Sequence, residues 1–349
     1  MRPPSAAPPP PRGRARVVSR RRLLGGGAAL AGAALVGIPA CDAPADTGVD
    51  TVLDPPITAI APVTPNEDFY VTSCCGTPDV DAATWALVVR VRGEEVARVD
   101  LAGLQAAAAA VDIEHTLECI SANPYNRAIG NAIWTGASLA AVLDALGVTV
   151  PPEAVELKFT SADAYTTAIP MGDLPNLSIV WAMNGAPLPP EHGYPARLLV
   201  PGRYGMKNPK WIVEIDLVDT PWVGFWEERG WSNEAFYKPN SLVLVPSRLE
   251  AIVEAGPVRV LGSAFAGTDP VVRVEVAVGD GAWEEAVLDY APGANVWTLW
   301  HVDLELAVGT HLVRTRCTTA SGAVTAENAE GTEPLEGYDG GMELAIEAV

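Results

Sequence analysis

Short runs of apolar and β-branched residues, separated by glycine and proline, constrain this chain more than any other feature. Its 349 residues include 32 glycines and 31 prolines, which interrupt regular structure frequently. Runs such as 85–91, 155–160, 196–200 and 271–278 have strand composition, and the last alternates with period two. Helical patterns occur at 101–110 and at 139–146, the second ending before Gly147. The sequence therefore predicts an α+β, β-rich fold.

The pattern of these runs changes near residue 246. Beyond it, strand-like runs at 258–262, 271–278, 297–300 and 310–317 follow one another with turn signals between them. About a hundred residues of such short strands predict an immunoglobulin-like β-sandwich. We therefore expect the following organisation: a leader over 1–41, a linker over 42–62, a unit carrying the chemistry over 63–245, and the sandwich over 246–349.

Charge divides the chain in a second way. The formal net charge is −20, yet residues 1–41 contain seven arginines and no acidic residue. The remainder carries 16 basic and 43 acidic residues, a net charge of −27. A body this acidic repels phosphate backbones, which excludes nucleic-acid binding as the main role and argues against a basic peripheral membrane protein.

The leader resembles a twin-arginine export signal, which predicts a periplasmic or other extracytoplasmic protein. Arg20, Arg21 and Arg22 precede an uncharged run over 23–40 that is rich in glycine and alanine. A retained membrane anchor is the alternative. The end of the run allows either lipid attachment through Cys41 or soluble release after the small-x-small sequence at 43–45.

The cysteines give no disulfide framework. Beyond Cys41 there are Cys74, Cys75, Cys119 and Cys317, without framework spacing. Sequence neighbours seldom form a disulfide, so Cys74, Cys75 and Cys317 are interpreted as small buried hydrophobic residues. The four histidines are scattered and no C-x-x-C pair is present, which argues against a zinc site.

One segment of the acidic part of the chain carries a net positive charge. Residues 192–213 contain no acid but include Arg197, Arg203, Lys207 and Lys210, a quarter of the basic residues after position 41. The glycines within it allow the backbone to approach a ligand closely. The segment indicates a site for a small anion, such as a molecule with a phosphate group. The alternative is an exposed loop with ordinary salt bridges.

Two segments of the first unit resemble the sulfite oxidase family of molybdenum enzymes. HGYPARLLVPGRYGMKNPKW at 192–211 resembles the family signature, and TLECIS at 116–121, followed by WTGASL at 134–139, resembles its cysteine-ligand motif. Weaker matches lie at 66–70, 161–165, 183–185 and 225–231. The resemblance covers about 62–245, and the sandwich resembles the family's C-terminal dimerisation domain, which implies a homodimer.

The resemblance implies a molybdopterin cofactor with molybdenum bound to one cysteine thiolate. Cys119 matches that ligand, and thiolate is a soft ligand suited to a transition metal. The catalytic residues implied are Cys119, Arg197 and Trp231. The cofactor-binding residues implied are Tyr70, Arg127, His192, Arg197, Gly202, Arg203, Lys207 and Lys210.

Departures from the family pattern narrow the range of substrates that we expect. Residues 71–74 stand where sulfite-oxidising members carry an arginine followed by Asn-His, and Trp231 stands in place of their active-site tyrosine. We therefore expect oxygen-atom transfer or two-electron redox chemistry on a small substrate other than sulfite. No haem-attachment motif is present, so an external electron carrier such as a cytochrome is expected. The alternatives are a methionine-sulfoxide-reductase-like repair enzyme and a cofactor-less binding protein on the same scaffold.

Overall fold

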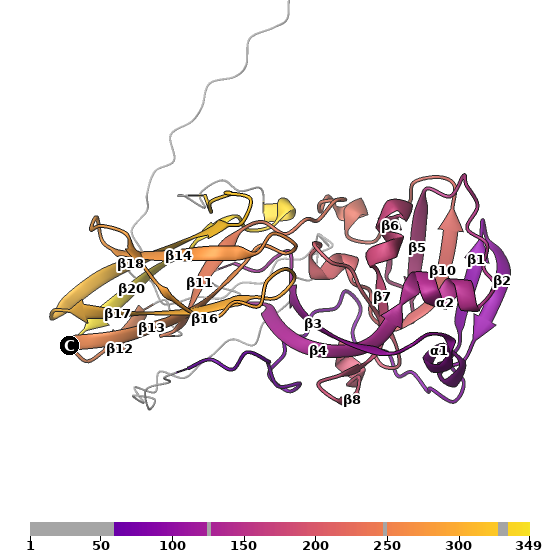
Figure 1. Cartoon of the computed structure of the whole chain (residues 1–349), viewed down its shortest axis with the longest axis horizontal. Helices are drawn as coiled ribbons and strands as arrows, with labels where there is room; N and C mark the ends of the chain where they lie inside the picture. Colours follow the sequence, from indigo (N-terminus) through magenta and orange to yellow (C-terminus); the bar gives the residue numbers. More distant parts are fainter. Residues whose placement is uncertain (1–58, 124–126, 247–249, 327–333) are drawn as a thin grey trace, which may run out of the picture. The chain divides into compact units, whose positions relative to one another are not determined.

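The computed structural model describes residues 59–123, 127–246, 250–326 and 334–349 (Figure 1). The described residues belong to one compact unit, Leu53–Val349. The predicted export signal, the lipidation site at Cys41 and most of the linker lie outside the described residues. Within the described ranges, none of the helices has the length and apolar character needed to cross a bilayer.

The first sheet carries the main apolar core of the unit that precedes the sandwich. Its strand order is β2 (Glu94–Val99), β1 (Leu87–Val91), β10 (Ile212–Val218), β5 (Glu156–Ser161) and β6 (Thr166–Pro170). β1 and β10 run parallel, and the other neighbours are antiparallel. Leu87, Phe159 and Ile215 are fully buried in this core. Burial of these alternate side chains explains why the short apolar runs fold as strands.

Two short helices pack against this core, α1 (Leu101–Ala107) and α2 (Leu139–Ala145). Asp100 caps α1 by accepting the Gly103 N–H, and Ser138 caps α2 by accepting the Ala141 N–H. Such caps contribute about 1 kcal/mol each. The helix expected over 101–110 ends three residues early, because Ala108 already has extended backbone angles.

A second sheet positions the candidate site. It contains β3 (Val111–Glu118), β4 (Ile129–Ser138), β7 (Ser178–Met183) and β8 (Ala186–Pro187), and β9 (Arg197–Leu199) pairs with β7. Three short 3-10 helices lie beside its strands or connect the two sheets: η1 (Met171–Asn176), η2 (Pro190–His192) and η3 (Gly205–Lys207). A further one, η4 (Glu227–Arg229), lies between β10 and β11. β3 thus ends immediately before Cys119, and β9 begins at Arg197.

The C-terminal region is a β-sandwich, as predicted. One sheet has the order β16 (Val287–Tyr290), β17 (Thr298–Leu306), β13 (Gly256–Phe265), β11 (Asn240–Val245) and β19 (Gly340–Gly341). The other has the order β12 (Glu250–Val253), β20 (Glu343–Ala348), β18 (Gly309–Thr319), β14 (Val271–Val278) and β15 (Glu284–Glu285). A short 3-10 helix, η5 (Pro334–Glu336), precedes β19. Val260, Trp300 and Leu344 lie in the core between the sheets.

The cysteines required one correction. Cys317 is fully buried in the sandwich core, as expected. Cys74 and Cys75, however, form a disulfide with each other, and Cys75 is exposed. The interpretation of this pair as buried hydrophobic residues is therefore wrong. The physical reason is local, since residues 71–77 form neither helix nor strand and no packing face draws the pair into a core.

Candidate functional site

Cys119 lies at the end of β3, where the chain turns toward β4. Its N–H donates to the Ala128 carbonyl, and its Sγ lies 3.1 Å from Ser121 Oγ. Gly205 leaves space beside it, because a Cβ there would lie 3.0 Å from Tyr70 Oη and 3.9 Å from the Cys119 Cα. Burial raises the pKa of the Cys119 thiol, while hydrogen bonds from Ser121 and Thr72 act in the opposite direction. A cation or metal is therefore needed to favour the thiolate.

Three tyrosines interact electrostatically with Cys119: Tyr165 and Tyr237, which are buried, and Tyr70, which is partly buried. Burial raises the pKa of Tyr70, Tyr165 and Tyr237, and the charge of Cys119 adds to each increase. Tyr237 Oη also accepts the Glu118 N–H, and Tyr165 Oη donates to the Met206 carbonyl. These hydroxyls stay protonated at neutral pH, so they act as hydrogen-bond donors. Of the three, the sequence prediction included only Tyr70.

Arg197 is a buried cation at the start of β9. Its guanidinium donates to the carbonyls of His192 at 3.0 Å and Asn208 at 3.2 Å, and it lies over the Trp134 ring at 4.9 Å. Its Nε is buried without a hydrogen-bond partner. Burial lowers the pKa of Arg197 to about 10. Within the described ranges it has no carboxylate in ion-pairing distance, which makes the side chain available to a buried anion.

Lys210 is a second cation beside Arg197, and it is partly buried. Its Nζ donates to the Glu191 carbonyl at 2.7 Å, and no salt bridge of Lys210 occurs in the part of the chain that the structure describes. Burial, and then the charge of Arg197, lower the pKa of Lys210 to about 7. His192 is buried beside the pair, with Nε2 at 2.9 Å from the Asn66 carbonyl, and burial lowers its pKa. A bound anion would restore the charged form of Lys210.

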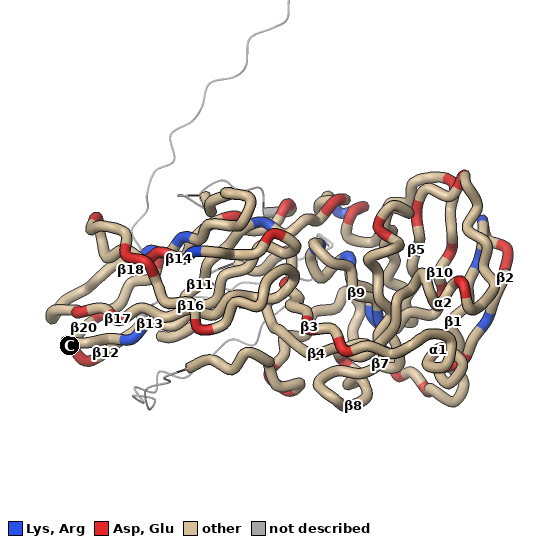
Figure 2. The backbone as a smooth tube through the Cα atoms, viewed as in Figure 1, with Lys and Arg blue, Asp and Glu red and all other residues tan. Residues whose placement is uncertain are grey.

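The other two cations of the acid-free segment are neutralised within the chain. Arg203 pairs with Asp173 at 2.7 Å and with Glu234 at 3.4 Å. Lys207 pairs with Glu227, and both side chains are 2% exposed. Figure 2 shows acidic residues over most of the chain and a group of basic positions beside β9. The structure thus separates the predicted cluster into two unpaired and two paired cations.

The remaining predicted residues lie at varied positions around this group. Gly202 has a left-handed φ of +80°, and its carbonyl accepts the Tyr237 N–H. Arg127 donates to the Leu244 carbonyl in β11, and burial lowers its pKa. Trp231 packs edge-on against Trp226, with 6.2 Å between ring centroids. The catalytic role of Trp231 stays a prediction. Tyr237, like Tyr70 and Tyr165, is an aromatic residue whose pKa is raised by Cys119.

Two further residues were missed at the sequence level. The buried side chain of Asn208 ties the loop after β9, because it accepts the Val200 N–H and donates to the carbonyls of Arg203 and Tyr204. Asn240 donates to both carboxylate oxygens of the buried Glu118. Burial raises the pKa of Glu118 to about 8. Asn208 lies within the 192–211 segment but was not singled out there, and Asn240 lies outside every motif, so only the fold reveals these contacts.

Comparison with known proteins identifies the family. Residues 75–226 match the model of the oxidoreductase molybdopterin binding domain. Mitochondrial sulfite oxidase of Mus musculus is 28% identical over 291 residues, covering 70% of this chain and 53% of that protein. Residues 75–226 therefore form a molybdopterin-binding oxidoreductase domain, and the chain is distantly related to the sulfite oxidases.

Two further matches agree with this relationship. Mitochondrial sulfite oxidase of Drosophila melanogaster is 26% identical over 310 residues, covering 73% of this chain and 53% of that protein. The crystal structure of the sulfane dehydrogenase SoxCD from Paracoccus pantotrophus shares the fold, with a TM-score of 0.67 at 20% identity and coverage of 77% and 75%. The chain spans about half the length of the mammalian sulfite oxidases it matches.

The residues present fit the cofactor of the sulfite oxidase family. Cys119 offers a thiol, and the unpaired Arg197 and Lys210 offer positive charge to an anionic group. The unpartnered Arg197 Nε is a buried donor that lacks an acceptor. The absence of a side chain at Gly205 keeps the space beside Cys119 open. Cys119 would hold the metal, and the two cations would hold the anionic part of the cofactor.

Proposed function

We propose that this protein is a molybdenum-dependent oxidoreductase of the cell envelope that acts on a small substrate other than sulfite. The observation that carries the enzymatic part is Cys119 together with two cations that form no salt bridge within the described residues, the buried Arg197 and the partly buried Lys210. Tyr70 interacts electrostatically with both Cys119 and Arg197. Burying a cation without a counter-charge is costly. A resident anion accounts for both residues at once, whereas a scaffold without a cofactor does not.

The chain's own residues have distinct tasks in this proposal. Arg197 and Lys210 neutralise the anionic part of the cofactor, and Lys210 takes up a proton as the anion binds. The Tyr70 and Tyr237 hydroxyls keep their protons, so they can donate hydrogen bonds to an oxygen of the substrate or product. The bound cofactor supplies the oxygen-atom and two-electron chemistry.

The envelope location rests on the leader sequence alone. A cofactor that is assembled in the cytoplasm has to leave it inside a folded protein, and a twin-arginine signal is suited to that route. An external electron carrier such as a cytochrome completes the two-electron cycle.

A dye-linked substrate screen tests the proposed activity. Full-length protein, produced in a host that makes molybdopterin, is assayed as an oxidase with an electron-accepting dye and as a reductase with a reduced dye. We expect turnover with a small sulfur or nitrogen oxyanion or oxide, loss of turnover in Cys119→Ser, and no comparable rate with sulfite. Sulfite turnover above every other compound would contradict the substrate proposal.

A further inference from the structure

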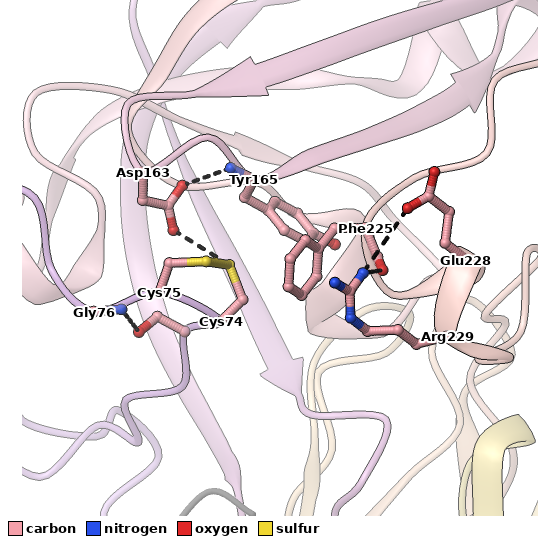
Figure 3. Close-up of a disulfide and its surroundings, with 9 residues drawn as sticks. Cys74, Cys75, Gly76, Asp163, Tyr165, Phe225, Glu228 and Arg229 are labelled. Carbon is pink, nitrogen blue, oxygen red and sulfur yellow. Dashed lines mark hydrogen bonds and ion pairs between the residues drawn. A yellow bond between two sulfur atoms is a disulfide. The ribbon is translucent and has the colours of Figure 1, made fainter. Parts of the chain in front are cut away.

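The disulfide between Cys74 and Cys75 borders the candidate site without belonging to it. Thr72, two residues before Cys74, hydrogen-bonds Cys119 through its side chain. On the other side of the pair, Cys74 Sγ lies 3.7 Å from Asp163 Oδ2, and Asp163 Oδ1 accepts the Tyr165 N–H at 3.1 Å. Figure 3 shows the two sulfurs facing Asp163, with Tyr165 and Phe225 beside them. The pair therefore stands at the rim of the Cys119 site.

The two sulfurs have different surroundings. Cys75 is exposed, whereas Cys74 is half-buried and faces the carboxyl group of Asp163. The three ligand atoms of Cys74, Cys75 and Asp163 lie within 4.8 Å of one another. A carboxylate at this distance repels an approaching thiolate and disfavours a thiolate on Cys74. Exposure makes Cys75 the sulfur open to attack. Cys74 is then the leaving group and has to be protonated as it leaves, because Asp163 disfavours its thiolate.

We propose that Cys74–Cys75 is a thiol-exchange site that captures a low-molecular-weight thiol as a mixed disulfide on Cys75, at the rim of the candidate site. Exposed disulfides are the labile, regulatory or catalytic ones, in contrast to structural bridges in a core. Segment 71–77 contains no helix or strand that the bridge would hold together. A disulfide at this position therefore stabilises little secondary structure.

The exchange takes place in two steps, and its atoms and electrons balance. A thiolate attacks Cys75 Sγ, the bond between the two protein sulfurs breaks, and Cys74 leaves, takes a proton from solvent and donates a hydrogen bond to Asp163. A second molecule of the thiol attacks the mixed disulfide and releases Cys75 as a thiol. Two thiols are oxidised to one disulfide, and the protein disulfide is reduced to a dithiol.

Reduced glutathione is the probe for the first test. The full-length, cofactor-loaded protein is incubated with it anaerobically in the presence of a chelator, then alkylated, digested and analysed by mass spectrometry. We expect alkylation of both Cys74 and Cys75 and formation of one oxidised glutathione per chain. A pair that stays bridged in the folded protein, and opens only when the protein is unfolded with reductant, overturns the proposal. So does a pair found fully reduced after aerobic purification.

Single-cysteine variants test which sulfur exchanges. With oxidised glutathione, Cys75 in the Cys74→Ser variant should form its adduct about tenfold faster than Cys74 in the Cys75→Ser variant, a difference of ~1.4 kcal/mol. Adding Asp163→Asn to Cys75→Ser should accelerate the adduct on Cys74, because the negative charge is gone. Asp289→Asn, which removes a carboxylate bound to His301 in the sandwich, is the matched control. Equal rates at the two sulfurs, or no response to Asp163→Asn, contradict the assignment.

These measurements count thiols and adducts, so they do not depend on the proposed oxidoreductase activity. An inactive protein whose Cys75 exchanges would refute the proposed function and leave this inference standing. An active enzyme whose pair stays bridged would do the reverse.

Discussion

Two lysines three positions apart are predicted to have opposite roles. Lys207 and Glu227 form an ion pair in which each side chain is 2% exposed, and Thr167 also donates to Glu227. Replacing Lys207 with methionine leaves a buried carboxylate without its partner, which costs about 3–5 kcal/mol. Against a total stability of roughly 5–15 kcal/mol, this is a large fraction.

Replacing Lys210 with methionine should have little effect on folding. The change removes one hydrogen bond to the Glu191 carbonyl, worth about 1 kcal/mol, together with a charge that burial disfavours. The net change in the free energy of unfolding should therefore stay within about 1 kcal/mol. Cofactor content should fall sharply in this variant, whereas the folded fraction of Lys207→Met should keep its cofactor.

The assay is urea unfolding of the cofactor-free proteins at pH 7, with cofactor content measured on separately loaded samples. The double variant Lys207→Met/Glu227→Gln should recover most of the stability, because the neutral amide still accepts from Thr167. Equal losses of stability in Lys207→Met and Lys210→Met would refute the division into paired and unpaired cations. So would normal cofactor content in Lys210→Met.

The same lysine predicts a pH dependence. The pKa of Lys210 is about 7 in the folded protein and 10.5 in its ordinary state. Between these values the unfolded chain binds more protons, so stability should rise with pH from about 7 toward 10.5. Lys210→Met should lose this contribution, which urea unfolding across the pH range measures. An unchanged slope in the variant would show that Lys210 is not desolvated.

Four further changes test the surroundings of Cys119. Gly205→Ala should keep the fold and lower cofactor content, because its Cβ would fill the space between Tyr70 Oη and the Cys119 Cα; metal analysis and circular dichroism check this. Because the pKa of Glu118 is about 8 in the folded protein and 4.5 ordinarily, the folded state keeps this proton where the unfolded state has lost it, and wild-type stability should fall as pH rises from about 4.5 to 8. Glu118→Gln should not show this fall in urea unfolding across the same pH range. Tyr237→Phe should lower turnover more than Trp231→Phe does, and the reverse order in steady-state kinetics would restore Trp231 as the active-site aromatic residue. Cys119→Ser should fold normally and lose turnover, because a hydroxyl is a poor metal ligand at neutral pH, and full activity would refute the ligand assignment.

The sequence was informative wherever local pattern decides structure. The strand expected at 271–278 is β14, with the same bounds. Its burial departs from strict alternation, because the register shifts between Val271 and Arg273. The helix before Gly147 ends as predicted, since Gly147 adopts a left-handed φ of +71°. The resemblance to the sulfite oxidase family also came from short contiguous motifs, which a single sequence preserves.

The sequence was uninformative wherever partners are distant along the chain. The acid-free segment could not show which of its cations are paired, because Asp173, Glu227 and Glu234 all lie outside it. The proximity of Tyr237 to Cys119 depends on more than a hundred intervening residues. Neighbouring cysteines seldom form a disulfide, so the sequence predicted none between Cys74 and Cys75. The structure has one, and nothing in the local composition indicates it.

The most direct test of the central claim is the molybdenum and molybdopterin content of the full-length protein. The protein is produced in a host that is competent for both molybdopterin synthesis and twin-arginine export, and it is analysed beside Lys210→Met. The proposed function predicts close to one molybdenum and one molybdopterin per wild-type chain, with a clear deficit of both in the variant. Wild-type protein that is folded and exported but nearly free of molybdenum would contradict it.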